Sequence, residues 1–183
     1  MRRIKIQDKE FKLFVPFANI KRAIDNIAMQ INNEYADKEL LFVVVLNGAF
    51  MFSAELLKGI KLPSRVSFVK LSSYDGSNTT GVVKEIIGLT EDIKDKHVII
   101  IEDIVDTGNT IEGLVKQLKS KGAASLKVAT LLFKPQAYLK NMKIDYVGLE
   151  IVNEFVIGFG LDYNGYGRNY ENIYSLIEKK TSN

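Results

Sequence analysis

Apolar residues along the chain alternate between helical spacing and short continuous runs. From Ile20 to Ile31 they recur at the i, i+3, i+4 and i+7 positions, which predicts an amphipathic helix over residues 17–35. The run LFVVVL (41–46) that follows is apolar on both faces, which is typical of a strand covered on both sides in a parallel sheet.

The rest of the chain continues this alternation. Further strands are predicted at residues 65–74, 97–102, 126–133, 145–152 and 172–177. Helices are predicted at residues 50–59 and from Ile111 to Leu118, the second ending near Gly122. The polar, glycine-flanked segment DGSNTTG (75–81) is predicted to be a loop.

Alternating strands and helices indicate an α/β protein built on a parallel sheet. No repeat, low-complexity tract or linker divides residues 1–183, so we expect a single domain. A chain of this length can bury roughly 70% of the surface that it exposes when unfolded.

Composition narrows the function classes. Hydrophobic residues make up 46% and charged residues 26% of the 183 positions, as in ordinary globular proteins. The net charge of +3, from 25 basic and 22 acidic residues, argues against a nucleic-acid binder. The absence of cysteine excludes disulfides and thiolate chemistry. Neither a membrane-spanning run nor the apolar core of a signal peptide is found, so we expect a cytoplasmic protein.

Residues 98–110, VIIIEDIVDTGNT, join an aliphatic strand to three acids and a glycine turn. Ligands of open α/β sheets bind beyond the carboxyl ends of the strands, where Glu102 and Asp103 are expected. The next helix should begin near Gly108, and the first N–H groups of a helix suit a phosphate. Gly108 lets the backbone approach the anion, while Thr107 and Thr110 add hydroxyl donors.

The acids of this stretch have a complementary role. Their carboxylates can accept hydrogen bonds from sugar hydroxyls and help to hold Mg²⁺, which prefers oxygen ligands. The predicted ligand is therefore a ribose phosphate. Other phosphate motifs fail, because no G-x-x-x-x-G-K-[ST] occurs, and the G-x-G pairs at 158–160 and 165–167 lack the third glycine of a dinucleotide site.

The same thirteen residues resemble the phosphoribosyl pyrophosphate motif of type I phosphoribosyltransferases. The resemblance implies the fold of that family, a central, mostly parallel sheet flanked by helices, with a small hood over the base site. It also implies that Asp106 is the general base, which accepts or holds the purine ring proton. The residues implied to bind phosphoribosyl pyrophosphate are Glu102, Asp103, Ile104, Asp106, Thr107, Gly108, Asn109 and Thr110.

Two further loops resemble the hypoxanthine-guanine branch of this family. VVVLNGAFMF (43–52) resembles its pyrophosphate loop, which implies that Asn47 and Gly48 bind the substrate and that the Leu46–Asn47 peptide is often cis in relatives. Many relatives carry a basic residue where this chain has Asn47. LSSYDGSNTTG (71–81) resembles the lid loop, with Ser73 and Tyr74 as its hallmark pair. A closed lid would exclude water from an oxocarbenium-like ribose.

The purine site is implied by two segments nearer the C-terminus. In ATLLFKP (129–135), the family places the lysine, here Lys134, at the exocyclic oxygen of the purine six-position. An ammonium group only donates hydrogen bonds, so it favours an oxo group over an amino group.

NEFVIGFGLDYNGYGRNY (153–170) resembles the F-V-V-G-x-x-L-D-Y segment of the branch. The resemblance implies that Phe155 stacks on the purine and that the backbone of Val156 bonds to the ring edge. Asp162 is implied near the purine and as a Mg²⁺ ligand. Arg168 is implied to pair with pyrophosphate, which suits its fixed fork of donors.

Together these segments imply an enzyme that transfers ribose 5-phosphate from phosphoribosyl pyrophosphate to hypoxanthine and guanine. The products would be IMP or GMP and pyrophosphate, in purine salvage. Mg²⁺ is the implied cofactor, with Glu102, Asp103 and Asp162 as its ligands. The expected partners are the two substrates and other copies of the chain, in a homodimer or a homotetramer, without nucleic acid or membrane.

Three alternatives stay open at this point. A regulatory protein of the same fold would sense phosphoribosyl pyrophosphate and bind nucleic acid, which calls for a concentrated basic face. A xanthine-preferring enzyme is the second alternative. The ratio of hypoxanthine to guanine use is the third, since it depends on backbone carbonyls. His97, the only histidine, is expected to have a structural role at the start of its strand.

Overall fold

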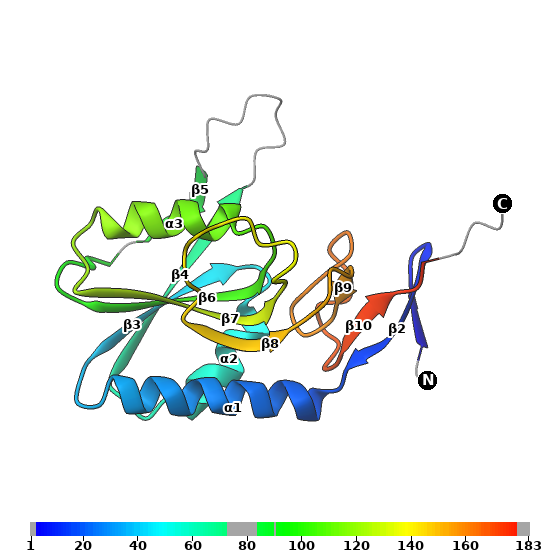
Figure 1. The fold of residues 1–183 in the computed structure, drawn as a ribbon, viewed down its shortest axis with the longest axis horizontal. Coiled ribbons are helices and arrows are strands. Elements are labelled where there is room, and N and C mark those ends of the chain that lie inside the picture. Colours follow the sequence, from blue (N-terminus) through cyan, green and yellow to red (C-terminus); the bar gives the residue numbers. More distant parts are fainter. Residues whose placement is uncertain (1–2, 73–83, 90, 179–183) are drawn as a thin grey trace.

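The computed structural model describes residues 3–72, 84–89 and 91–178. Within these residues the chain forms a six-stranded and a four-stranded sheet, which lie beside each other (Figure 1). The strands of the larger sheet are β3 (Leu40–Leu46), β4 (Ser64–Ser72), β5 (Lys84–Ile87), β6 (His97–Val105), β7 (Ser125–Phe133) and β8 (Tyr146–Glu150). Those of the smaller sheet are β1 (Arg3–Ile6), β2 (Lys9–Val15), β9 (Val156–Ile157) and β10 (Ile173–Leu176).

The larger sheet has the order β5-β4-β3-β6-β7-β8. Strands β4, β3, β6, β7 and β8 pair in parallel, and β5 pairs with β4 in the antiparallel direction. The parallel sheet predicted from the sequence is therefore confirmed. Because parallel strands end at the same edge, their carboxyl ends bring together loops that are far apart in the chain.

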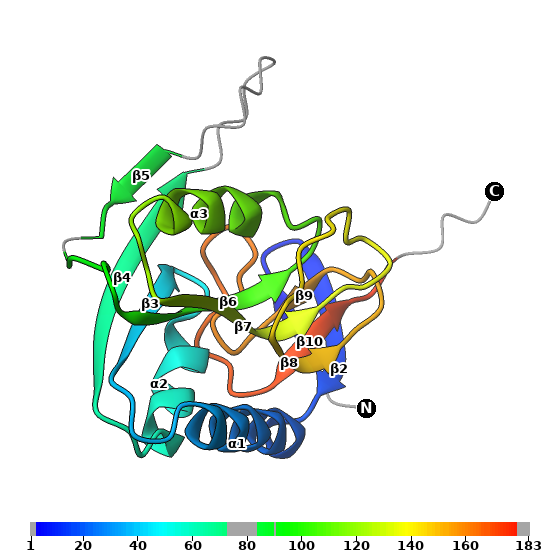
Figure 2. The ribbon, with the colours of Figure 1, turned by 60° about the vertical axis from the view of Figure 1, so that its left-hand side comes forward.

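Helices cover both faces of this sheet. Helices α1 (Phe17–Glu34) and α2 (Phe50–Gly59) lie on one face, and α3 (Asn109–Lys119) lies on the other (Figure 2). Alternate strand residues serve the two layers, so that Phe42 packs with the α1 side while Val43 packs with α3. Both are fully buried, which explains why the strands are continuous apolar runs.

The four-stranded antiparallel sheet, here called the hood, has the order β1-β2-β10-β9. It joins the first strands of the chain to the last, since Tyr174 of β10 pairs with both Leu13 of β2 and Ile157 of β9. Tyr174 and Phe11 are buried in its own small apolar cluster. The hood lies at the end of the larger sheet where β3, β6 and β7 terminate (Figure 1).

The predicted elements agree closely with those observed. The helix predicted at 17–35 is α1, and the one predicted at 50–59 has the bounds of α2. The sequence prediction missed β1, β2, β5 and β9, and it ended β6 three residues early, at Glu102. The loop predicted at 75–81 lies outside the described residues. No helix in the described part of the chain is long and apolar enough to cross a membrane.

Candidate active site

The ends of three neighbouring strands carry most of the predicted site residues. Asn47 follows β3 and Lys134 follows β7. Glu102 and Asp103 lie within β6, close to its carboxyl end, rather than after it. The amide of Lys134 donates a hydrogen bond to the carbonyl of Val105, with a length of 3.0 Å. This hydrogen bond places Lys134, the first residue after β7, beside Asp106, the first residue after β6.

Asp106 and Lys134 form the central ion pair of the site. The Nζ of Lys134 lies 2.8 Å from Oδ2 of Asp106. Lys134 is only 7% exposed, whereas 44% of the Asp106 side chain is exposed. A buried ammonium needs a charged partner, and Asp106 supplies one. The structure thus brings together the residue predicted as general base and the residue predicted to select the purine.

A glycine turn joins β6 to α3. Gly108 caps the helix with a φ of 83°, in the left-handed region, and a Cβ there would lie 2.4 Å from the ring of Tyr138. Because the cap residue has no side chain, the first N–H groups of α3 receive no side-chain cap. A cleft of about 190 Å³ lies against this turn and is lined by residues 102–111, which include Ile104, Thr107, Asn109 and Thr110.

Glu102 and Asp103 form a pair of crowded carboxyl groups. Burial raises the pKa of Glu102 well above its usual value, and the neighbouring charge of Asp103 adds to the effect. Burial also raises the pKa of Asp103, although the nearby charge of Arg168 opposes it. Oδ1 of Asp103 accepts a 2.8 Å hydrogen bond from the amide of Ile104, whereas Oε2 of Glu102 is buried without a partner among the described residues. Such a pair suits a cation or the hydroxyls of a sugar.

The loop after β3 is packed tightly between the sheet and the loop that follows β9. The Leu46–Asn47 peptide is cis, as the resemblance implies. A Cβ on Gly48 would lie 1.6 Å from Oδ2 of Asp103, and one on Gly160 would lie 2.0 Å from the carbonyl oxygen of Gly48. Only glycine fits at both positions, so Gly48 and Asp103 lie in direct contact.

Asp162 and Arg168 pair with each other in the segment after β9. The guanidinium Nη2 lies 2.6 Å from Oδ1 of Asp162, and Nη1 donates a 2.7 Å hydrogen bond to the carbonyl of Gly160. Oδ2 of Asp162 accepts a 2.6 Å hydrogen bond from the amide of Gly165. The positive charge of Arg168 also opposes the rise that burial causes in the pKa of Asp103.

The hood contributes Phe155 and Val156. Phe155 is 46% exposed, and its ring centroid lies 6.0 Å from that of Tyr163 and 6.4 Å from that of Phe11. Val156 is buried and its backbone belongs to β9, where it pairs with Ser175. The half-exposed ring offers a flat apolar face. The other two predicted residues, Ser73 and Tyr74, lie outside the described part of the chain.

Of the three predicted Mg²⁺ ligands, Glu102 and Asp103 fit the ion better than Asp162 does. Across residues 3–72, 84–89 and 91–178, no three acidic or histidine side chains converge as a closed metal site. Asp162 already uses both oxygens, with Arg168 and with Gly165. Glu102 and Asp103 could hold an ion through one or two carboxylates, and Mg²⁺ commonly completes such a shell with water and substrate phosphates.

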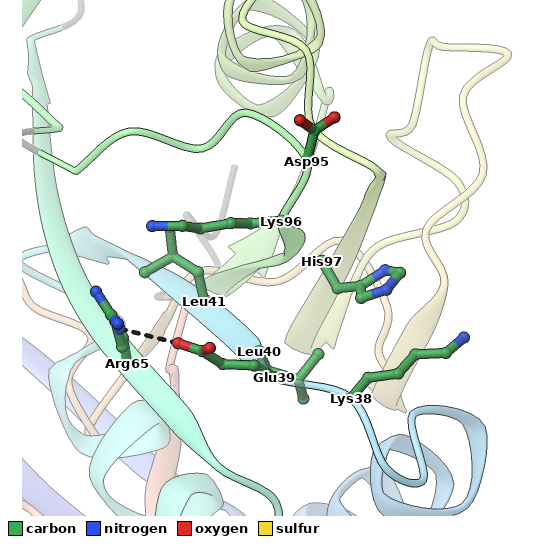
Figure 3. Close-up of a pocket in the computed structure, with 8 residues that line it drawn as sticks. All are labelled: Lys38, Glu39, Leu40, Leu41, Arg65, Asp95, Lys96 and His97. Carbon is green, nitrogen blue, oxygen red and sulfur yellow. Dashed lines mark ion pairs between the residues drawn. The ribbon is translucent and has the colours of Figure 1, made fainter.

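A second pocket, of about 240 Å³, lies at the amino ends of β3 and β6 (Figure 3). It is lined by Lys38, Glu39, Leu40, Leu41, Arg65, Asp95, Lys96 and His97. Nδ1 of His97 lies 2.8 Å from Oγ of Ser125, and its ring meets Tyr35 edge-on. The histidine is thus held far from the strand ends that carry the acids, as expected from its position in the sequence.

Sequence reasoning missed the loop that supports the glycine turn. Tyr138 and Lys140 both pack against Gly108, and Leu139 donates a 3.2 Å backbone hydrogen bond to the carbonyl of Thr107. Nothing in KPQAYLKNMK marks these residues, because their contacts depend on the path of the loop after β7. Phe11 and Tyr163, which flank Phe155, were also missed, because their ring contacts form only in the folded hood.

Comparison with known proteins identifies the family. A family model described as the phosphoribosyl transferase domain matches residues 16–164, so the chain belongs to the phosphoribosyltransferase family. It is 39% identical over 173 residues to the hypoxanthine-guanine phosphoribosyltransferase of Streptococcus pneumoniae, covering 94% of this chain and 96% of that protein. It is 38% identical over 155 residues to the hypoxanthine phosphoribosyltransferase of Escherichia coli, covering 83% and 87%.

Solved structures agree with this assignment. A hypoxanthine phosphoribosyltransferase from Staphylococcus aureus matches with a TM-score of 0.87 and 35% identity, covering 94% of each chain. The type I phosphoribosyltransferase fold expected from the sequence is therefore confirmed, as is the resemblance to the hypoxanthine-guanine branch.

Proposed function

We propose that this protein transfers ribose 5-phosphate from phosphoribosyl pyrophosphate to hypoxanthine and guanine, as an enzyme of purine salvage. The observation that carries the proposal is the Asp106–Lys134 pair, 2.8 Å long, which adjoins both the glycine turn and the acids of β6. The names of the related proteins from Streptococcus pneumoniae and Escherichia coli support the same activity.

In this proposal each part of the site binds one part of the substrates. The backbone of the glycine turn, with Thr107 and Thr110, receives the 5-phosphate. Glu102 and Asp103 accept hydrogen bonds from the ribose hydroxyls. Phe155 stacks on the purine, and Lys134 leaves Asp106 to donate a hydrogen bond to the purine oxygen. The purine thus lies between the larger sheet and the hood.

The reaction exchanges one bond for another at the anomeric carbon. The bond from this carbon to the pyrophosphate oxygen breaks, and a bond from the purine nitrogen forms. Asp106 accepts or holds the proton of that nitrogen, while the negative field of Glu102 and Asp103 stabilises the cationic ribose. Mg²⁺ held near Glu102 and Asp103 would neutralise charge on pyrophosphate, and Arg168 would pair with the released group.

A spectrophotometric assay with phosphoribosyl pyrophosphate and Mg²⁺ tests this function. Purified protein is given hypoxanthine, guanine, xanthine and adenine separately. We expect turnover with hypoxanthine and guanine, none with adenine, and loss of activity in excess chelator. Turnover with xanthine alone would favour the xanthine-preferring alternative. No turnover with any base, together with a gel shift of RNA or DNA at physiological salt, would favour the regulatory one.

We also propose that the chain assembles as a homodimer or a homotetramer. Met29, Phe50 and Phe68 are large apolar side chains that are exposed in the single chain, and a subunit contact would cover such surface. Size-exclusion chromatography with light scattering should give two or four times the mass of the chain. A monomer at micromolar concentration would contradict this proposal.

A further inference from the structure

Glu112 gives the phosphate-binding end of α3 an unfavourable charge. Its amide donates a 3.0 Å hydrogen bond to the carbonyl of Gly108, so Glu112 closes the first turn of the helix. An acid there is favourable for the free helix, because it faces the positive end of the dipole. A bound 5-phosphate would occupy the same end and would be repelled by the carboxylate.

Two lysines contact this carboxylate from different elements. Oε2 of Glu112 lies 3.2 Å from Nζ of Lys140 and 3.3 Å from Nζ of Lys116. These contacts, with Lys140 contributing most, hold the pKa of Glu112 below its usual value. The surroundings of the lysines differ, since the side chain of Lys116 is 71% exposed and that of Lys140 only 22%. Solvent therefore screens Lys116 more than Lys140.

Lys140 also touches the glycine turn itself. Its Cγ lies 2.9 Å from the place of a Cβ on Gly108, so its aliphatic stem runs along the turn while its ammonium reaches Glu112. The loop is held there by the backbone bond from Leu139 to Thr107 and by the ring of Tyr138, whose hydroxyl donates a 2.6 Å bond to the carbonyl of Met142. Lys116, one helical turn after Glu112, has no such contact with Gly108 among the three nearest atoms.

We infer that Lys140 is an electrostatic positioning residue for the phosphate site: it neutralises Glu112 and adds positive charge beside Gly108, so that the turn accepts a dianionic 5-phosphate. The inference rests on the proposed function, because it concerns the affinity for phosphoribosyl pyrophosphate. Lys140 acts through Glu112 and through the local field, and it takes no part in bond making.

Four variants test this role: Lys140→Gln, Lys116→Gln, Glu112→Gln and the double variant Lys140→Gln/Glu112→Gln. Lys116→Gln is the matched control, since it removes one charge and one partner of the same carboxylate. At low salt, Lys140→Gln should raise the KM for phosphoribosyl pyrophosphate about fivefold, with kcat and the KM for hypoxanthine changed less than about twofold. Lys116→Gln should change all three constants less than about twofold. Adding Glu112→Gln should restore most of the lost affinity.

The salt dependence separates this role from a structural one. The effect of Lys140→Gln on KM should shrink at high ionic strength, whereas a loop displaced by the substitution would remain displaced. Equal effects of Lys140→Gln and Lys116→Gln, or no rescue in the double variant, would overturn the inference. If the wild type transfers no phosphoribosyl group, the proposed function fails. The same four variants, compared by calorimetry with ribose 5-phosphate, would still decide the role of Lys140.

Discussion

At the residue scale, Asp106 and Lys134 restrain each other until substrates bind. Lys134 is buried, and its ammonium has Asp106 as an ion-pair partner at 2.8 Å. In the proposed reaction this contact separates, so that the lysine meets the purine oxygen and the carboxylate becomes available to the purine proton. The two charges thus hold each other in place before the reaction begins.

Asp106→Asn tests the general base. The amide keeps the size of the side chain but does not accept a proton, so kcat should fall by about 10²–10⁴-fold. The KM for phosphoribosyl pyrophosphate should change little, because the glycine turn and the acids of β6 are unaltered. Steady-state kinetics measure both constants. An unchanged kcat would remove Asp106 from the mechanism.

Glu102 is expected to lower the stability of the free protein. Its Oε2 is buried without a partner among the described residues, and Asp103 adds a like charge. Glu102→Gln removes this repulsion, so the free energy of unfolding at pH 7 should rise by about 1 kcal/mol, while the affinity for phosphoribosyl pyrophosphate falls. Urea denaturation and calorimetry measure the two effects. A variant that is less stable than the wild type would contradict the prediction that Glu102 destabilises the free protein.

At the element scale, the pattern of apolar residues in the sequence predicts more of the fold than it does of the site. The strands β3, β6 and β7 were predictable because both of their faces are apolar. The strands β1 and β2 alternate apolar and polar residues, but β2 pairs with β10, about 160 residues later, and local patterns do not reveal such a partner.

In the site, likewise, the sequence motif predicts which residues group together, whereas their contacts depend on the fold. The grouping of Glu102, Asp103 and Asp106 was predictable, because the three acids follow an aliphatic run and precede a glycine turn. The Asp106–Lys134 contact was not, since it requires the register of β6 with β7. The placement of Lys140 against Gly108 depends on the path of the loop after β7, which no spacing in the sequence encodes.

The end of α1 is attached to the sheet by Glu34. Its carboxylate accepts a 2.5 Å hydrogen bond from the hydroxyl of Tyr146 and also pairs with Lys127. The bond from Lys127, followed by that from Tyr146, lowers the pKa of Glu34 below its usual value of 4.5. A lowered pKa in the folded state means that the stabilisation is present above pH 4.5 and is lost as the pH falls through the folded-state value.

Glu34→Gln should therefore reduce the loss of stability in acid. At pH 7 the variant should be less stable by about 0.5–1 kcal/mol, because the side chain is partly exposed to solvent. The difference from the wild type should shrink as the pH falls below 4.5. Urea denaturation between pH 7 and pH 3 measures this, with the exposed Glu10→Gln as a control for net charge. A difference that stays constant over this range would contradict the assignment.

At the scale of the whole molecule, the two sheets carry different parts of the proposed site. The larger sheet carries the glycine turn, the acids and Lys134, whereas the hood carries Phe155. The hood is completed only when β2 from the start of the chain pairs with β10 from its end. In the proposed function, the support for Phe155 against the purine therefore depends on both ends of the sequence, whereas Lys134 and the phosphate-binding turn come from later parts of the larger sheet.

Phe11→Leu tests this division. Phe11 is fully buried in the hood, and its ring lies 6.4 Å from that of Phe155 and 6.3 Å from that of Tyr163. Loss of the ring should lower the free energy of unfolding by about 1–2 kcal/mol and loosen Phe155. The KM for hypoxanthine should rise several-fold, while the KM for phosphoribosyl pyrophosphate stays within about twofold, since it is set by the larger sheet.

Phe42→Leu is the matched control, because Phe42 is also fully buried but lies in β3 of the larger sheet. It should cost a similar amount of stability without the selective effect on hypoxanthine. Thermal denaturation establishes that the two losses are comparable, and steady-state kinetics then compare the two KM values. If both variants raise the KM for hypoxanthine equally, the effect follows from general destabilisation, and the hood does not act as a separate support for the purine.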